Sequence, residues 1–155
     1  MPMLIWLLLS LVVIVLDQLS KYWVDHAMQL YQSIELLPGL QLTYVRNTGA
    51  AFSFLSQAGG WQRWFFIGLG ISASGLIGWW LHRLDRCRQI EAMSWALVLG
   101  GALGNVIDRV LYGYVIDFLD VYYQDWHWPA FNVADSAISL GVVLLLIDSL
   151  RPRPA

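Results

Sequence analysis

The sequence is poor in charged residues and in cysteine, and its charges do not favour one sign strongly. Only 13% of its 155 residues are charged, whereas a soluble domain has about a quarter. The net charge of −2 argues against a nucleic-acid partner, which would need a basic patch or stripe. The single cysteine, Cys87, excludes a disulfide within the chain and a cysteine-rich metal site.

The sequence is rich in hydrophobic residues, which make up 58% of the chain, and many of them form four long apolar stretches. Each of the four stretches is close to the ~20 residues that a helix needs to cross the hydrocarbon of a bilayer. We therefore expect a single integral membrane domain over residues 1–155, mainly α-helical, with both termini on the same side. The predicted spans are residues 3–23, 64–81, 92–110 and 131–150.

The connections between the spans predict the orientation of the chain. Arginines are concentrated in the connection 82–91 and in the tail after residue 150. Because cytoplasmic loops carry an excess of Lys and Arg, we expect both termini to be cytoplasmic and the connections 24–63 and 111–130 to face outward. Alternating apolar residues near Leu40 predict a strand in the first outer connection, and β-branched and aromatic residues predict another in the second. Such a sheet must lie at or above the membrane surface, since exposed sheet edges cannot sit in hydrocarbon.

Two groups of polar residues interrupt the predicted helices, where such residues usually mark function or tight packing. Asp17 and Lys21 are spaced i, i+4 and can form a salt bridge on one helix face. In the segment GGALGNVIDRVLYG, polar residues also share one face: Asn105, Asp108, Arg109 and Tyr112. They either staple the bundle through an Asp108–Arg109 network or serve a site. Three glycines there permit close approach of another helix: Gly100, Gly101 and Gly104.

Further carboxylates follow at the outer ends of the last two spans. Asp117 has apolar neighbours on both sides and is either a loop carboxylate or part of a site. Asn132 and Asp135 open the last span; helix capping explains Asn132 but explains Asp135 poorly, because Asp135 is already inside the first turn. Two carboxylates that share a site cannot both ionise cheaply, so one keeps a proton. Such a pair can perform acid–base chemistry on an amide.

Other catalytic chemistries find no support in the sequence. A zinc protease would need HExxH on a helix, but His26, His82 and His127 are far apart, and no histidine lies in a span to activate a serine. Two interpretations remain: an aspartate enzyme, and a proton-coupled carrier or scaffold that uses Asp108, Asp117 and Asp135. A carrier should bring ionisable groups to mid-bilayer on both halves of a repeat. No repeat is visible, which favours the enzyme.

Five motifs occur in an order that closely resembles one bacterial family, lipoprotein signal peptidase (signal peptidase II). They are DQLSK, YVRNTGAAFSF, GGALGNVIDR, VIDF and FNVADSAI, and the resemblance covers nearly the whole chain. It implies a polytopic aspartic protease of the bacterial cytoplasmic (inner) membrane that removes signal peptides from prolipoproteins, cutting just before the lipid-modified cysteine. It also implies a four-helix bundle with a small extracytoplasmic β-cradle and a short membrane-surface helix.

The resemblance assigns roles to individual residues. The catalytic dyad falls on Asp117 and Asp135. Asp108 is the alternative second carboxylate, but its neighbour Arg109 should hold it ionised, which suits a scaffold better. The positions that line, brace or support the site are Asn47, Asn105, Asp108, Arg109, Asn132, Gly101, Asp17 and Lys21.

The resemblance also implies the partners of the site. We expect a lipid-modified prolipoprotein as substrate, membrane lipid around a monomer, no nucleic acid, and neither a metal nor another cofactor. The site should open sideways to lipid near the periplasmic face. We expect apolar side chains near the first outer connection to receive acyl chains: Phe52, Phe54 and Trp61.

Overall fold

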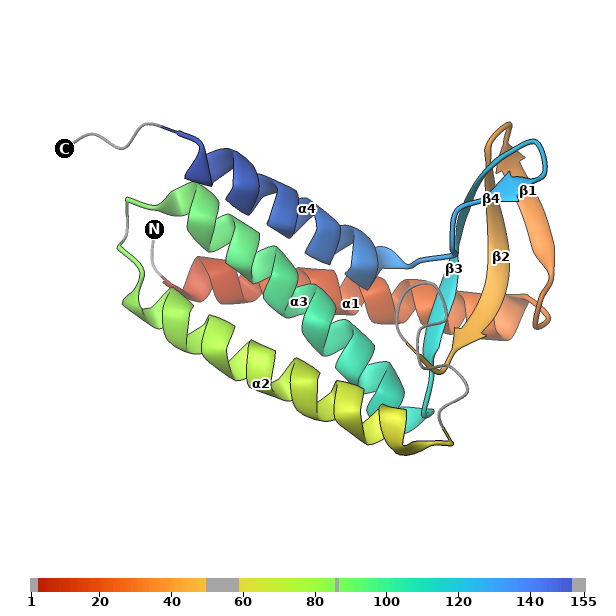
Figure 1. Cartoon of the computed structure of the whole chain (residues 1–155), viewed down its shortest axis with the longest axis horizontal. Coiled ribbons are helices and arrows are strands. Elements are labelled where there is room, and N and C mark those ends of the chain that lie inside the picture. The colour runs from red at the N-terminus through yellow and green to blue at the C-terminus, as the bar shows by residue number, and fades with distance from the viewer. Residues whose placement is uncertain (1–2, 50–58, 86, 152–155) are drawn as a thin grey trace.

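The computed structural model describes residues 3–49, 59–85 and 87–151. Four helices run alongside one another, and a small antiparallel sheet closes one end of the bundle (Figure 1). Helix α1 begins and α4 ends at the opposite end of the bundle (Figure 1). The elements in chain order are α1 (Met3–Ala27), β1 (Ser33–Leu37), β2 (Leu40–Asn47), α2 (Trp61–Arg83), α3 (Gln89–Leu111), β3 (Val115–Tyr123), β4 (Trp126–His127) and α4 (Val133–Ser149).

The lengths of the helices follow from their apolar runs. Within the described ranges, α1, α2 and α3 are long and apolar enough to cross a membrane. Helix α4 has 17 residues, the lower limit for a membrane-crossing helix. It is shorter than the predicted stretch 131–150 because Phe131 pairs with Leu119 of β3 and Asn132 forms the N-cap. The predicted short surface helix is not found in residues 3–49, 59–85 or 87–151.

Helix α3 lies at the centre of the bundle and packs against the other three helices. More than half of its apolar window is buried, against 17% in α1 and α2, so α1 and α2 turn most of their apolar side chains outward. Glycines permit the close packing of α3, as the sequence predicts. A Cβ added to Gly100 would meet the Ser10 carbonyl oxygen of α1 at 2.8 Å, and one added to Gly101 would overlap the Ala134 carbonyl of α4.

The sheet has the strand order β1-β2-β3-β4, with antiparallel neighbours throughout. Strands β2 and β3 confirm the two strands expected in the outer connections. The register between them shifts between Leu42 and Val45, and Val45 then pairs with Asp117. The sheet lies beyond the ends of α2, α3 and α4 and beside the last turns of α1 (Figure 1), at one end of the bundle, which agrees with the rule that sheet edges avoid hydrocarbon.

A small apolar core fixes the sheet to the end of α1. Val24 and Met28 pack there against Tyr44 of β2 and against Ile116 and Phe118 of β3. Successive strand residues point to opposite faces. Because Ile116 and Phe118 enter this core, the residue between them, Asp117, must point the other way, toward the bundle ends of α3 and α4.

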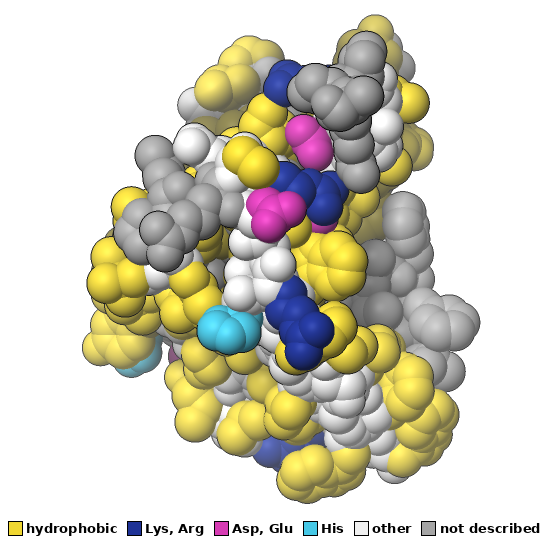
Figure 2. Space-filling model, turned by 90° about the vertical axis from the view of Figure 1, so that its left-hand side faces the viewer, with side chains coloured by type: hydrophobic (Ala, Val, Ile, Leu, Met, Phe, Trp, Pro, Cys, Tyr) yellow, Lys and Arg dark blue, Asp and Glu magenta, His cyan; other side chains and the backbone are white. Residues whose placement is uncertain are grey.

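The end of the bundle opposite the sheet combines basic, acidic and histidine side chains with hydrophobic ones (Figure 2). There the Glu91 carboxylate in the first turn of α3 pairs with Arg88. The indole nitrogen of Trp80 on α2 donates a hydrogen bond of 3.0 Å to the same carboxylate. These contacts join α2 to α3 at the end farthest from the sheet.

The packing predicts that Gly101→Ala lowers the stability of the bundle. The new methyl group would overlap backbone atoms of α4, which cannot rotate away, and such overpacking costs about 1–3 kcal/mol. The free energy of unfolding is measured by titration with sodium dodecyl sulfate in mixed micelles.

Gly75→Ala is the matched control, because nothing lies within 4 Å of the Cβ that it would add on α2. Alanine favours a helix over glycine, so this variant should be as stable as the wild type or slightly more so. Equal stability of the Gly101 and Gly75 variants would contradict the close packing of α3 on α4.

Candidate active site

Two aspartates meet in a pocket where the sheet joins the bundle. The pocket has a volume of about 660 Å³, and Asp117 of β3 and Asp135 of α4 both line it. Asn47, Asn105 and Arg109 line the same pocket. These five residues come from β2, α3, β3 and α4, so the site exists only when the sheet is seated on the helices.

Two asparagines connect the aspartates. Asn132 donates from Nδ2 to Asp117 Oδ1 at 2.7 Å, and Asn105 donates from Nδ2 to Asp135 Oδ1 at 2.8 Å. Asn132 Nδ2 also lies 3.3 Å from Asn105 Oδ1. Each carboxylate therefore receives an amide donor that carries no charge, and the two amides contact each other.

Asn47 holds the second oxygen of Asp117. Its Nδ2 donates to Asp117 Oδ2 at 3.0 Å, and its Oδ1 accepts from the backbone N–H of Gly49 at 3.0 Å. The hydrogen bond to Gly49 closes a turn directly after β2, and this turn aims the amide of Asn47 at the pocket. Asp117 is 3% exposed and so depends on these amides in place of water.

The surroundings of Asp117 raise its pKa. Burial is the main cause and the neighbouring charge of Asp135 is the second; the amides of Asn47 and Asn132 and the more distant charge of Lys21 oppose them. The result is a pKa of about 7, against an ordinary value of 3.8. Near neutral pH Asp117 can therefore hold a proton that an exposed aspartate would have lost.

Helix capping contributes to the position of Asp135, contrary to the expectation from sequence. Asn132 accepts from the backbone N–H of Asp135 at 2.9 Å, and Asp135 Oδ2 accepts from the backbone N–H of Asn132 at 3.3 Å. This is a capping box, which satisfies two free N–H groups of the first turn reciprocally. The other oxygen of Asp135 remains for Asn105 and the pocket.

The buried Lys21 of α1 contacts residues that support the site. The expected Asp17–Lys21 salt bridge is present at 2.8 Å, and the Lys21 ammonium also pairs with Asp108 at 2.9 Å. Its third contact is Asn105 Oδ1 at 3.0 Å. Lys21, Asp17 and Asp108 are each at most 2% exposed, so this cluster is cut off from solvent.

The Asp108–Arg109 network, one of the two interpretations of this polar face, is not formed among the described residues. Asp108 faces α1, where Lys21 and Gln18 bind its oxygens, and its Oδ2 also accepts from the backbone N–H of Ile116 at 3.1 Å. Consecutive residues on a helix point about 100° apart. Arg109 consequently points into the pocket, whereas Asp108 points toward α1.

Arg109 places a positive charge in the pocket. It donates to the Gly49 carbonyl at 2.8 Å and to the Asn105 carbonyl at 3.3 Å, and its guanidinium stacks over the ring of Phe66. Its Nε is buried and has no hydrogen-bond partner among the described residues. Arg109 thus faces the aspartates without forming an ion pair with either of them.

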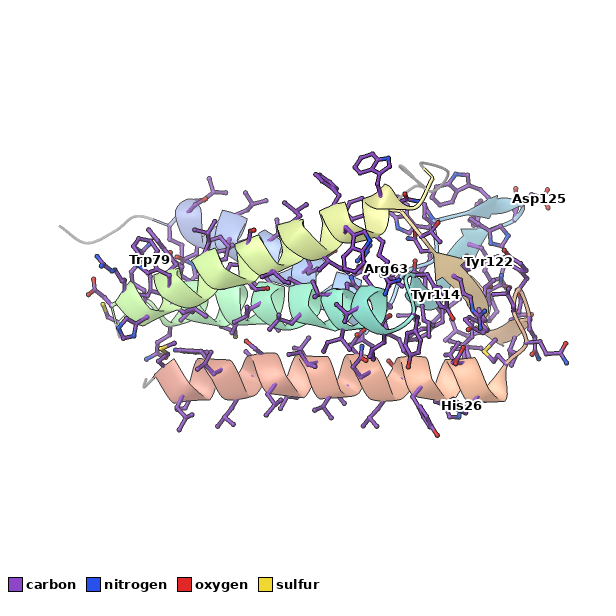
Figure 3. The ribbon with its side chains drawn as sticks, turned by 90° about the horizontal axis from the view of Figure 1, so that it is seen from below. His26, Arg63, Trp79, Tyr114, Tyr122 and Asp125 are labelled. Carbon is purple, nitrogen blue, oxygen red and sulfur yellow. The ribbon has the colours of Figure 1, made fainter. Side chains whose placement is uncertain are left out.

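Arg63 is a support that the sequence did not reveal. From the start of α2 it donates to the carbonyl oxygens of Arg109 and Val110 at 2.8 Å each, and it lies near Tyr114 at the junction of bundle and sheet (Figure 3). Cations are favourable at a helix C-terminus. In the sequence, Arg63 is a basic residue directly before the predicted span 64–81. That position does not reveal that its side chain binds the end of α3.

The other expectations for the site have separate outcomes. Phe52 and Phe54 lie outside the described residues. Trp61 has an exposed ring at the start of α2 and is not among the residues that line the pocket. No group of His, Cys, Asp or Glu able to hold a metal ion is found in the described part of the chain.

Comparison with known proteins gives the family of the chain. The family described as signal peptidase (SPase) II matches residues 9–151. The lipoprotein signal peptidase of Pseudoalteromonas atlantica is 54% identical over 148 residues, which cover 96% of this chain and 90% of the relative. That of Actinobacillus succinogenes is 47% identical over 146 residues, with 94% and 90% covered.

Two solved structures share the fold. A bacterial membrane enzyme solved by the in meso method at 2.3 Å resolution has a TM-score of 0.84 and 30% identity, and the match covers 97% of this chain and 93% of that one. A second, at 1.9 Å resolution, has a TM-score of 0.83 and 33% identity, with 96% and 94% covered. Since the family match spans most of the chain, this protein belongs to the signal peptidase II family.

Proposed function

We propose that this peptidase is an aspartic endopeptidase that removes the signal peptide from diacylglyceryl-modified prolipoproteins, cutting just before the lipid-modified cysteine. Membership of the lipoprotein signal peptidase family supports a protease that acts on prolipoproteins. The observation that carries the aspartic mechanism is the pair Asp117 and Asp135 in one pocket, bridged by Asn105 and Asn132.

In the proposed mechanism, the aspartates divide the acid and base roles. Asp117, whose pKa is raised to about 7, holds the proton. Asp135 takes a proton from a water molecule, which attacks the scissile carbonyl carbon, while the Asp117 acid donates a hydrogen bond to the forming oxyanion. The proton held by Asp135 then passes to the leaving amine. The amides of Asn105 and Asn132 keep both carboxyl groups in place without neutralising them.

The same proposal assigns a topology. All four helices cross the bacterial inner membrane, residues 1–155 form one domain, and the sheet is a cradle on the periplasmic face beside the active site. Both termini and the connection 82–91 are then cytoplasmic, and the connections 24–63 and 111–130 are outside. The position of the sheet at one end of the bundle (Figure 1) and the basic residues at the other end (Figure 2) support this orientation. The proposed active form is a monomer.

A proton-coupled carrier is less well supported. The aspartates that would form its relay, Asp108, Asp117 and Asp135, all lie near the end of the bundle that carries the sheet. Asp108 is bound by Lys21 and by a backbone N–H, which suits a fixed support. A transport path would need ionisable groups that continue through the bundle.

We expect Asp117→Asn and Asp135→Asn each to reduce cleavage by about 10²–10⁴-fold, because asparagine keeps the size of the side chain but cannot exchange a proton. The assay uses purified protein and a diacylglyceryl-modified prolipoprotein peptide. Asp125→Asn is the matched control, since Asp125 is exposed and lies at the far tip of the sheet (Figure 3). Full activity of the folded Asp117 variant would contradict the assignment of Asp117 to the dyad.

The proposed mechanism also predicts the pH dependence of cleavage. Because the raised pKa of Asp117 is about 7, kcat/KM should fall as the pH rises through about 7 and the proton on Asp117 is lost. Asn47 lowers the pKa of Asp117 through its hydrogen bond, so Asn47→Ala should move this alkaline limb to higher pH. A pH–rate profile from pH 5 to pH 9 (about two units on either side of the transition) checks both statements. An alkaline limb that Asn47→Ala leaves in place would assign the titration to another group.

A further inference from the structure

The active-site pocket continues along α4 beyond the aspartate. Ser136, Ile138 and Ser139 line it together with Asp135. Ser139 follows Asp135 by one helical turn and shares its face, so the two side chains are separated by about 6 Å along the helix. The pocket therefore extends from the reacting carboxylates along α4, away from its first turn, and it presents a hydroxyl group there.

The hydroxyl of Ser139 differs from most other serine hydroxyls of the helices. Ser10, Ser94 and Ser136 donate to backbone carbonyls one turn earlier. Ser139 is exposed, and within residues 3–49, 59–85 and 87–151 no hydrogen bond is found for its hydroxyl. A hydroxyl without a partner is unfavourable in apolar surroundings. A ligand that brings a hydrogen-bond acceptor into the pocket would satisfy it.

The proposed substrate brings such an acceptor, and at this point the inference rests on the proposed function. Its lipid is attached to the cysteine that follows the scissile bond. The path from the attacked carbonyl carbon to the nearer ester carbonyl runs through the cysteine side chain, the thioether and the glycerol carbons. At ordinary bond lengths this path spans on the order of 8 Å. It exceeds the separation of about 6 Å between Asp135 and Ser139 by less than the length of one hydrogen bond, about 2.8 Å, so the hydroxyl of Ser139 can reach the ester carbonyl.

We propose that Ser139 donates a hydrogen bond to an ester carbonyl of the diacylglyceryl group and so determines specificity for an ester-linked lipid. An ester carbonyl accepts hydrogen bonds, and the serine hydroxyl supplies the donor. Ser136 cannot fill this role while its hydroxyl is bonded to the Asn132 carbonyl at 2.8 Å. The contact lies away from the scissile bond and acts on substrate binding, not on the chemical step.

The test compares two synthetic prolipoprotein peptides that differ only in the lipid linkage: one carries an S-diacylglyceryl cysteine and the other an S-dialkylglyceryl cysteine, whose ether oxygens replace the ester groups. The loss of one neutral hydrogen bond corresponds to about a twofold to tenfold change in affinity. Ser139→Ala should raise KM by that factor for the diester peptide, leave kcat unchanged, and leave KM for the diether peptide unchanged. Ser139→Thr, which keeps the hydroxyl, should restore the wild-type KM.

Ser72→Ala is the matched control, because Ser72 is also an exposed serine of a long apolar helix and does not line the pocket; it should leave both peptides unaffected. Equal loss of Ser139→Ala toward both peptides would assign Ser139 a structural role and overturn the proposal, as would an unchanged KM for the diester. If the wild type cuts neither peptide, the proposed function itself fails and this inference with it. If the wild type cuts both peptides and Ser139→Ala changes the KM of neither, the inference about Ser139 is refuted but the proposed function stands.

Discussion

One buried ammonium group holds together the elements that form the site. Lys21 contacts Asp17, Asp108 and Asn105 at 2.8–3.0 Å, with almost no exposure to solvent. A charge removed from water must be paired and hydrogen-bonded, so α1 and α3 cannot separate here without a large cost. Asp17 in turn accepts from the backbone N–H of Ala134 at 2.9 Å, which connects the first turn of α4 to the same cluster.

The contrast between Asp108 and Asp117 shows how surroundings separate a supporting carboxylate from a reacting one. Asp108 has an ammonium partner and a backbone donor, and both hold it in a fixed position against α1 and the start of β3. Asp117 has only amide partners and a second carboxylate nearby. Neutral amides fix the position of Asp117 but leave it able to gain or lose a proton. A lysine in place of either asparagine would hold the charge permanently.

Much of the fold was predictable because it depends on local pattern. The apolar runs are long enough for a helix to cross the hydrocarbon of a bilayer. The i, i+4 spacing of Asp17 and Lys21 brings these side chains together on any helix. Small residues such as Gly101 permit close packing of helices. The two strands were predictable from alternation and from β-branched residues. The residue at which the span predicted over 131–150 begins could not be predicted, since the pairing of Phe131 with β3 is a tertiary contact.

The partners within the site were not predictable in the same way. Arg109 follows Asp108 in the sequence, yet the ion-pair partner of Asp108 is Lys21, more than 80 residues away. Which helix a polar side chain faces depends on the rotation of the helices in the bundle, and no local pattern encodes that rotation. The family resemblance supplied the identities of the residues, while their hydrogen bonds became known only from the packed structure.

Asn132 belongs both to the cap of α4 and to the pocket. Its Oδ1 accepts from the first turn of the helix, and its Nδ2 holds Asp117. Helix ends are ordinarily the parts that fray first, and fraying at this end would remove one of the two amide donors of Asp117, leaving only that of Asn47. We therefore expect a local opening of this one helical turn to disturb the site while the rest of the bundle stays folded.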